Sequence, residues 1–131
     1  MKYPAFNISE KSWKGKELEL DAYILFDEFN YNNKTKTFEK YFLNKKICDS
    51  NGKVYKIKGR KIPNSIWRRI FSFLPNVFKC KYITERINEE LTLDNLRNYL
   101  LDRISELEQD DFSQEWKTDV RKAKTYEELI N

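Results

Sequence analysis

The fold class depends most on residues 50–58, which read SNGKVYKIK. The Asn51-Gly52 pair readily adopts the positive φ values of a type I′ turn, which connects the two strands of many β-hairpins. Beyond this turn, Lys53–Lys58 would form the returning strand, with Tyr55 and Ile57 on one face and Lys56 and Lys58 on the other. We therefore expect a β-hairpin at the centre of the chain.

The segments before this hairpin differ in how clearly they predict secondary structure. Apolar residues alternate with polar ones over Glu17–Phe26, which is typical of a strand with one buried face. Residues 37–48 fit either a strand or a helix, and their periodicity does not decide between the two.

The segments after the hairpin predict a helix, a strand and a second helix. Pro63-Asn64-Ser65 is a start signal for a helix over Ile66–Leu74, and alternation over Phe78–Tyr82 predicts another strand. Thr92 would cap the most regular helix of the chain, in which apolar residues recur every three or four positions.

Two further helices complete the expected order of elements. Asp111 or Ser113 would begin the first, and Thr125 with Glu128 would form a capping box for a short last one. Because strands come first and helices last, we expect an α+β fold, a mostly antiparallel sheet with a central hairpin, packed by C-terminal helices. No linker rich in Pro, Gly or Ser interrupts the chain, so residues 1–131 are expected to form a single domain.

Several classes of catalytic and metal site are excluded by composition. The 131 residues include no histidine, which removes imidazole catalysis and histidine-ligated zinc or haem. Cys48 and Cys80 are too far apart for a C-x-x-C redox pair, so we expect buried free thiols, with a disulfide as the alternative in an oxidising compartment. No spacing of acidic residues selects a catalytic pair or a calcium loop. The chain is therefore expected not to be an enzyme and to need no metal or cofactor.

The expected location follows from the apolar runs. Met1 leads into polar sequence without the apolar region of a signal peptide. The longest fully apolar run, Ala22–Phe26, is far shorter than the ~20 residues that span a bilayer. We expect a cytoplasmic protein.

Charge is strongly segregated along the chain. Residues 34–86 contain 15 Lys or Arg against three acidic residues, a net charge of +12. Residues 87–131 contain six basic and 12 acidic residues, a net charge of −6. The overall net charge of +4 therefore hides a basic middle and an acidic end.

Three interpretations compete for the basic middle. Its segment 53–69 could bind nucleic-acid phosphates, it could dock an acidic protein, or its charges could form a solvated face that is partly neutralised within the fold. In the last case, the acidic residues of the expected strand Glu17–Phe26 would stand opposite the lysines of the hairpin. The residues that would contact phosphates are Lys56, Lys58, Arg60, Arg68 and Arg69.

The acidic end contains a tract formed by Glu106, Glu108, Asp110 and Asp111. The dipole of a following helix accounts for Asp110 and Asp111, but not for the two glutamates at the end of the preceding helix. We therefore consider this tract a candidate binding surface that could mimic phosphates and cover the basic cleft of a nuclease. Trp13, in a polar loop, could be an exposed anchor for a partner or could fold back over the edge of the sheet.

In type, the chain resembles the small cytosolic immunity proteins that bacteria make against their own toxins. The resemblance lies in a short single domain that lacks a signal sequence and a catalytic motif, is rich in aromatic residues, and concentrates charge over Lys53–Arg69 and Glu106–Asp111. It implies a stoichiometric inhibitor that covers a toxin domain. Our leading hypothesis is thus a binding protein that neutralises a protein partner, and the alternative is a nucleic-acid-binding domain that uses segment 53–69.

Overall fold

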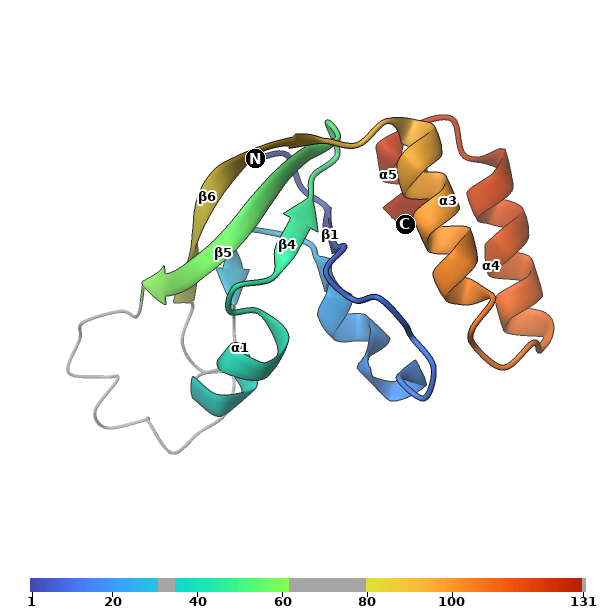
Figure 1. Cartoon of the computed structure of the whole chain (residues 1–131), viewed down its shortest axis with the longest axis horizontal. Helices are drawn as coiled ribbons and strands as arrows, with labels where there is room; N and C mark the ends of the chain where they lie inside the picture. The colour runs from blue at the N-terminus through green and yellow to red at the C-terminus, as the bar shows by residue number, and fades with distance from the viewer. Residues whose placement is uncertain (31–34, 62–79, 131) are drawn as a thin grey trace.

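The computed structural model describes residues 1–30, 35–61 and 80–130, and Figure 1 shows their arrangement. Eleven helices and strands lie in these ranges. In chain order they are β1 (Ala5–Asn7), the 3₁₀ helix η1 (Glu17–Tyr23), β2 (Ile24–Leu25), β3 (Phe29–Asn30), α1 (Thr35–Tyr41), β4 (Lys46–Cys48), β5 (Lys53–Lys61), β6 (Cys80–Glu90), α3 (Leu93–Ile104), α4 (Asp111–Lys122) and α5 (Tyr126–Ile130).

The strands form one six-stranded sheet in the order β2-β1-β4-β5-β6-β3. Every neighbouring pair is antiparallel, and β4 with β5 forms the central hairpin. Helices α3, α4 and α5 stand together at one end of the molecule, while α1 lies at the other (Figure 1). The α+β fold with an antiparallel sheet, a central hairpin and packed C-terminal helices is therefore confirmed.

The hairpin turn differs in type from the one that the sequence predicts. Gly52 has a φ of 80°, whereas Asn51 does not share this positive φ. The Asp49 carbonyl oxygen accepts a hydrogen bond from the Gly52 N–H (3.0 Å), and its carboxylate accepts from the Asn51 and Lys53 N–H groups (2.9 Å each). The Asp49 side chain thus holds a turn in which only the glycine needs the left-handed conformation.

The predicted strand over Glu17–Phe26 is wrong. Residues 17–23 form η1, and only Ile24 and Leu25 continue as a strand. The chain turns at Gly15, whose φ is 76°, and the Lys16 N–H donates a hydrogen bond to the Trp13 carbonyl (2.9 Å). This bond between residues three positions apart is the first of a series that continues into η1. Leu18, expected on the buried face, is fully exposed, while Leu20 and Tyr23 pack inward three residues apart.

Residues 37–48, which fit either a helix or a strand by periodicity, contain part of each. Helix α1 continues to Tyr41, and the chain turns at Asn44, whose φ is 61°. Strand β4 then begins at Lys46. The helix predicted over Ile66–Leu74 lies outside the described residues, as does Phe78, the first residue of the strand predicted over Phe78–Tyr82, of which β6 contains the end.

The C-terminal helices begin where the sequence predicts. The Thr92 hydroxyl accepts a hydrogen bond from the Asn95 N–H (3.1 Å) at the start of α3. Asp110 caps α4, and the Thr125 hydroxyl accepts from the Glu128 N–H (3.2 Å) at α5. The Glu128 carboxylate accepts from the Lys124 N–H instead of closing the predicted reciprocal pair with Thr125.

The sheet has an apolar cluster on each face. Phe6 and Cys48 face the C-terminal helices, where they join Trp13, Leu96 and Leu100. Their chain neighbours Ala5 and Ile47 face the other way, in a cluster with Leu25, Phe38 and Ile57. Both cysteines are free and buried, as the sequence predicts. The two clusters fix the C-terminal helices on one face of the sheet and α1 on the other.

Candidate protein-binding surface

The acidic tract predicted from the sequence divides into two structural and two exposed residues. The Glu106 carboxylate accepts a hydrogen bond from the Trp13 N–H (2.6 Å) and forms an ion pair with Arg103 (3.2 Å). Glu106 therefore joins the N-terminal loop to the end of α3. This contact explains an acidic residue that the helix dipole leaves unexplained.

Asp110 also has a structural role. Its carboxylate accepts from the Ser113 N–H (2.9 Å), and the Ser113 hydroxyl accepts from the Asp110 N–H (3.0 Å). This reciprocal capping box begins α4. Glu108 and Asp111 are exposed, and neither has an ion-pair partner among the described residues. Asp110 is exposed as well, but its carboxylate is engaged in the cap, so Glu108 and Asp111 are the residues of the tract most available to a partner.

Helix α4 extends the acidic surface beyond the predicted tract. Asp111, Glu115 and Asp119 recur every fourth residue, so they form a row along one side of the helix. All three are exposed, and no cation of residues 1–30, 35–61 or 80–130 pairs with them. Sequence reasoning missed Glu115 and Asp119, although their spacing after Asp111 is a signal that could have found them.

An apolar groove lies beside this acidic row. It has a volume of about 480 Å³ and lies where η1 and α4 meet, with further lining residues from β1, β2 and α5; its lining includes Asp21, Glu115 and Asp119. Phe112 and Trp116 also line it, and 69% of the Phe112 surface is exposed. Large aromatic side chains at exposed positions are typical of the centre of protein interfaces.

Trp13 lies inside the molecule and is not an exposed anchor. Its ring is fully buried and stacks on Trp116, with 5.7 Å between the ring centroids. It also packs against Phe6 (5.7 Å) and, edge to face, against Tyr99 (6.4 Å). Of the two interpretations that the sequence leaves open, the structure supports the one in which Trp13 folds back.

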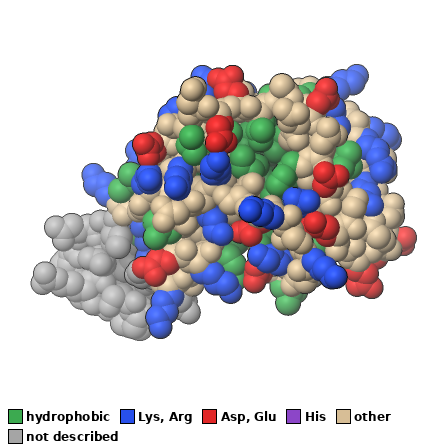
Figure 2. All heavy atoms as spheres, viewed as in Figure 1, with side chains coloured by type: hydrophobic (Ala, Val, Ile, Leu, Met, Phe, Trp, Pro, Cys, Tyr) green, Lys and Arg blue, Asp and Glu red, His purple; other side chains and the backbone are tan. Residues whose placement is uncertain are grey.

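The basic residues of the hairpin have acidic neighbours. Lys58 pairs with Glu85 (3.5 Å). Lys56 stands directly across the sheet from Glu85 and also from Lys46, which itself pairs with Glu89 (2.8 Å). Basic and acidic side chains accordingly intermingle on the face shown in Figure 2.

The expected partners of these lysines are wrong, because the neutralising charges come from β6 and not from residues 17–21. Within that segment, Glu19 forms an ion pair with Lys40 of α1 (3.8 Å). Arg60 lies over the Phe38 ring at 5.0 Å. Arg68 and Arg69 lie outside the described residues.

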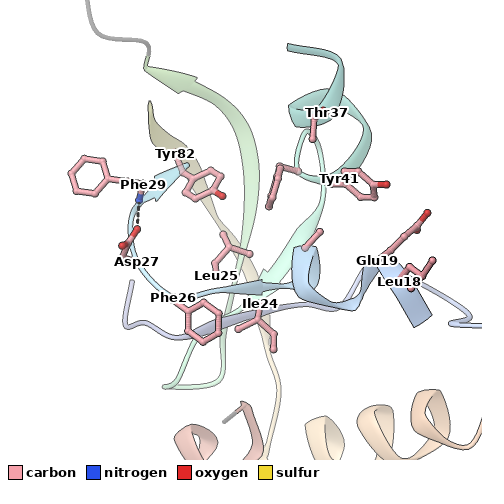
Figure 3. A pocket seen from close by; sticks show the side chains of 12 residues that line it. Leu18, Glu19, Ile24, Leu25, Phe26, Asp27, Phe29, Thr37, Tyr41 and Tyr82 are labelled. Atoms are coloured by element: carbon pink, nitrogen blue, oxygen red, sulfur yellow. Dashed lines mark hydrogen bonds between the residues drawn. The ribbon is translucent and has the colours of Figure 1, made fainter. Parts of the chain in front are cut away.

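A second groove, of about 420 Å³, lies between α1 and the segment that contains η1 and β2 (Figure 3). Its lining is mostly apolar and includes the exposed side chains of Leu18 and Phe26. The Asp27 carboxylate at its edge accepts a hydrogen bond from the Phe29 N–H (2.8 Å) (Figure 3). This carboxylate therefore closes a local turn.

Burial raises the pKa values of a thiol and a phenol inside the molecule. Burial raises the pKa of the Cys48 thiol to about 12, which opposes formation of a reactive thiolate. Burial likewise raises the pKa of Tyr99, whose hydroxyl donates to the Glu10 carbonyl (2.7 Å). Among the described residues, no three Cys, Asp or Glu side chains gather as ligands for a metal ion.

No helix of the described chain is both long and apolar enough to cross a bilayer. Comparison with known proteins found no matching family model, no matching curated protein and no matching solved structure. The function is therefore argued from the geometry of this chain.

Proposed function

We propose that the chain is a non-catalytic binding protein, and specifically an immunity protein that neutralises a cognate toxin domain in the cytoplasm. The contact would be made by the acidic face of α4, by which we mean Asp111, Phe112, Glu115, Trp116 and Asp119. The observation that carries this proposal is the row of three carboxylates that have no ion pair among the described residues and lie beside an exposed aromatic ring.

The row of carboxylates destabilises the free protein. Carboxylates four residues apart on a helix repel each other by a few tenths of a kcal/mol per pair. Asp111 is compensated by the positive end of the α4 dipole, but Glu115 and Asp119 lie beyond the first turn and have no such compensation. A basic partner would convert this repulsion into attraction and would be steered toward the surface.

Inhibition would follow from occlusion. A nuclease domain presents Lys and Arg side chains to the phosphates of its substrate. Carboxylates spaced along α4 can pair with the same cations, while Phe112 and Trp116 supply the apolar contact that excludes water from the centre of an interface. This mechanism requires no catalytic group in the inhibitor.

The experiment is a charge reversal with a control on another helix. Glu115→Lys with Asp119→Lys should weaken binding to the purified toxin domain encoded beside this protein on the order of tenfold or more, and protection of cells from that toxin should fall. Asp102→Lys is the control, since Asp102 lies on α3 about 200° around the helix from the buried Leu100. Unchanged affinity in the α4 variant would overturn the proposal.

One further measurement separates loss of binding from loss of folding, and a second tests the alternative function. The free energy of unfolding of Glu115→Lys should rise by about 0.5 kcal/mol, because two repulsive pairs become attractive. Binding of the unmodified chain to double-stranded DNA or RNA, with affinity that falls steeply as salt increases, would instead support the alternative that segment 53–69 contacts nucleic acid.

A further inference from the structure

All the charged residues that line the groove between η1 and α4 are acidic. Three of its lining residues are polar, and all three are acidic: Asp21 from η1, and Glu115 and Asp119 from α4. The carboxylates therefore approach the groove from two separate elements. Within the described part of the chain, no Lys or Arg forms an ion pair with any of them.

The other lining residues form an apolar and aromatic wall. Trp116 is held in place by stacking on the buried Trp13, with an angle of 22° between the ring planes. Phe112 packs against Trp116 at 6.0 Å. A cation that enters this groove would meet aromatic rings with a fixed orientation, and tryptophan is the ring that attracts cations most strongly.

These features favour an arginine side chain over other cations. A guanidinium is planar and weakly hydrated, so it stacks on aromatic rings and accepts burial more readily than an ammonium. Its several N–H donors can reach carboxylates on two walls at once, whereas its aliphatic stem can cover apolar surface. A volume of about 480 Å³ leaves room for such a side chain together with part of the segment that carries it.

We propose that this groove receives an arginine side chain of the basic partner, with its guanidinium against Trp116 and Phe112 and paired with the carboxylates of Asp21, Glu115 and Asp119. The inference rests on the proposed function, because it names the part of the partner that the acidic face of α4 recognises. In this arrangement, the groove determines which side chain of the partner is recognised. The rest of the acidic row attracts the partner through its charge.

The test uses N-acetyl-arginine amide as the probe and the indole N–H signal of Trp116 as the readout, assigned with Trp116→Phe. N-acetyl-citrulline amide is the matched control, because it retains the shape of arginine without the charge. The arginine compound should shift the Trp116 signal with an affinity on the order of fivefold or more above that of citrulline, and above that of N-acetyl-lysine amide. Equal shifts with all three compounds, or none, would overturn the inference.

Variants assign the effect to the groove. Asp119→Asn and Phe112→Leu should each weaken binding of the arginine compound at least twofold, whereas the distant Asp102→Asn should leave it unchanged. Loss of toxin binding on charge reversal without any arginine binding would refute this inference and leave the proposed function standing. Arginine binding without an effect of charge reversal on the toxin would refute the proposed function, and with it the assignment of the arginine to this partner, but not the affinity of the groove for arginine.

Discussion

Glu106 joins two parts of the chain that are 93 positions apart, through its hydrogen bond to the Trp13 N–H. Its carboxylate is partly shielded from solvent and also pairs with Arg103. The residue was selected from the sequence as a candidate for binding, yet its contacts are internal. Charge alone could not distinguish the two roles, because the partner N–H lies in a distant loop that no local pattern places beside α3.

Replacement of Glu106 by Ala should lower the free energy of unfolding by about 1–3 kcal/mol, because the Trp13 N–H and the Arg103 guanidinium lose a charged acceptor. Glu108→Ala is the matched control, and its effect should stay within about 0.5 kcal/mol, since Glu108 is exposed without an ion pair among the described residues. Urea unfolding followed by circular dichroism measures both. Equal losses in the two variants would contradict the structural role of Glu106.

Glu10 links stability to pH. Burial by itself raises the pKa of Glu10, but hydrogen bonds from Lys45 (2.9 Å) and Lys16 (3.2 Å) outweigh it and lower this pKa below its usual value of 4.5. Because the folded pKa is below the unfolded one, the stabilisation is fully present above about pH 4.5 and is lost as pH falls through the folded pKa.

Replacement of Glu10 by Gln should therefore destabilise the protein at pH 7 by about 1–2 kcal/mol, and this difference from the unmodified chain should shrink toward pH 3. Urea midpoints measured across this range test the sign. A difference that grows as the solution is acidified would refute the assignment. Glu108→Gln, which removes an exposed carboxylate and therefore changes the net charge by the same amount, controls for net charge.

At the scale of the element, the turn between β4 and β5 also supports the junction between β6 and α3. The Gly52 carbonyl accepts a hydrogen bond from the Leu91 N–H (2.7 Å). The Tyr126 hydroxyl of α5 donates to the Leu91 carbonyl (2.6 Å). A Cβ atom at Gly52 would lie 2.4 Å from the Leu91 carbonyl oxygen, so the turn has no space for a side chain.

Gly52→Ala should consequently destabilise the protein more than Gly15→Ala. Both glycines have a positive φ, which costs alanine about 1–2 kcal/mol, but a Cβ at Gly15 would meet no atom within 4 Å. The two variants therefore share the conformational cost and differ in the steric clash. Their free energies of unfolding, from denaturant titration, should differ by at least about 1 kcal/mol. Equal losses would show that the clash relaxes at no cost.

Elements with signals in adjacent residues were predictable from the sequence. Thr92 and Asp110 begin helices through bonds to residues three positions ahead, and the Asn51-Gly52 pair indicates the hairpin. The segment Glu17–Phe26 was not predictable, since its alternating apolar residues fit the periods of a strand and of a short 3₁₀ helix. In the 3₁₀ helix, Tyr23 contacts the distant Trp13, with 6.0 Å between the ring centroids.

The candidate site was predictable only in part. The tract predicted from the sequence shares one residue, Asp111, with the row on α4. The groove could not be foreseen, because it forms where η1 meets α4, and the sequence predicts a strand in place of η1. Asp21 reaches the surface of this groove only through that helix.

At the scale of the whole molecule, the sheet couples two apolar clusters through alternate residues of its short strands. Cys48 belongs to the cluster beneath the C-terminal helices, while its neighbour Ile47 belongs to the opposite one. If either cluster unfolded, the strand that contributes residues to the other cluster would be exposed. We expect both to unfold in a single transition.

The Cys48 thiol reports on this transition. With Cys80 replaced by Ala, Cys48 should react with a thiol reagent only after unfolding, because it is fully buried and burial raises its pKa to about 12. The fraction labelled should follow the loss of circular dichroism as urea increases. Rapid labelling in native buffer would contradict coupled unfolding, and the same reagent applied in concentrated urea confirms that the thiol is intact.

Strand β1 lies between β2 and β4, and its Phe6 packs in one cluster with Leu129 and Ile130 of α5. During synthesis, Phe6 emerges from the ribosome before Leu129 and Ile130, which follow it by more than a hundred positions. Until then, Phe6 and Trp13 lack the surfaces that cover them, and the growing chain exposes aromatic side chains that chaperones recognise. Slower synthesis of the residues between Trp13 and α5 should accordingly lower the yield of folded protein.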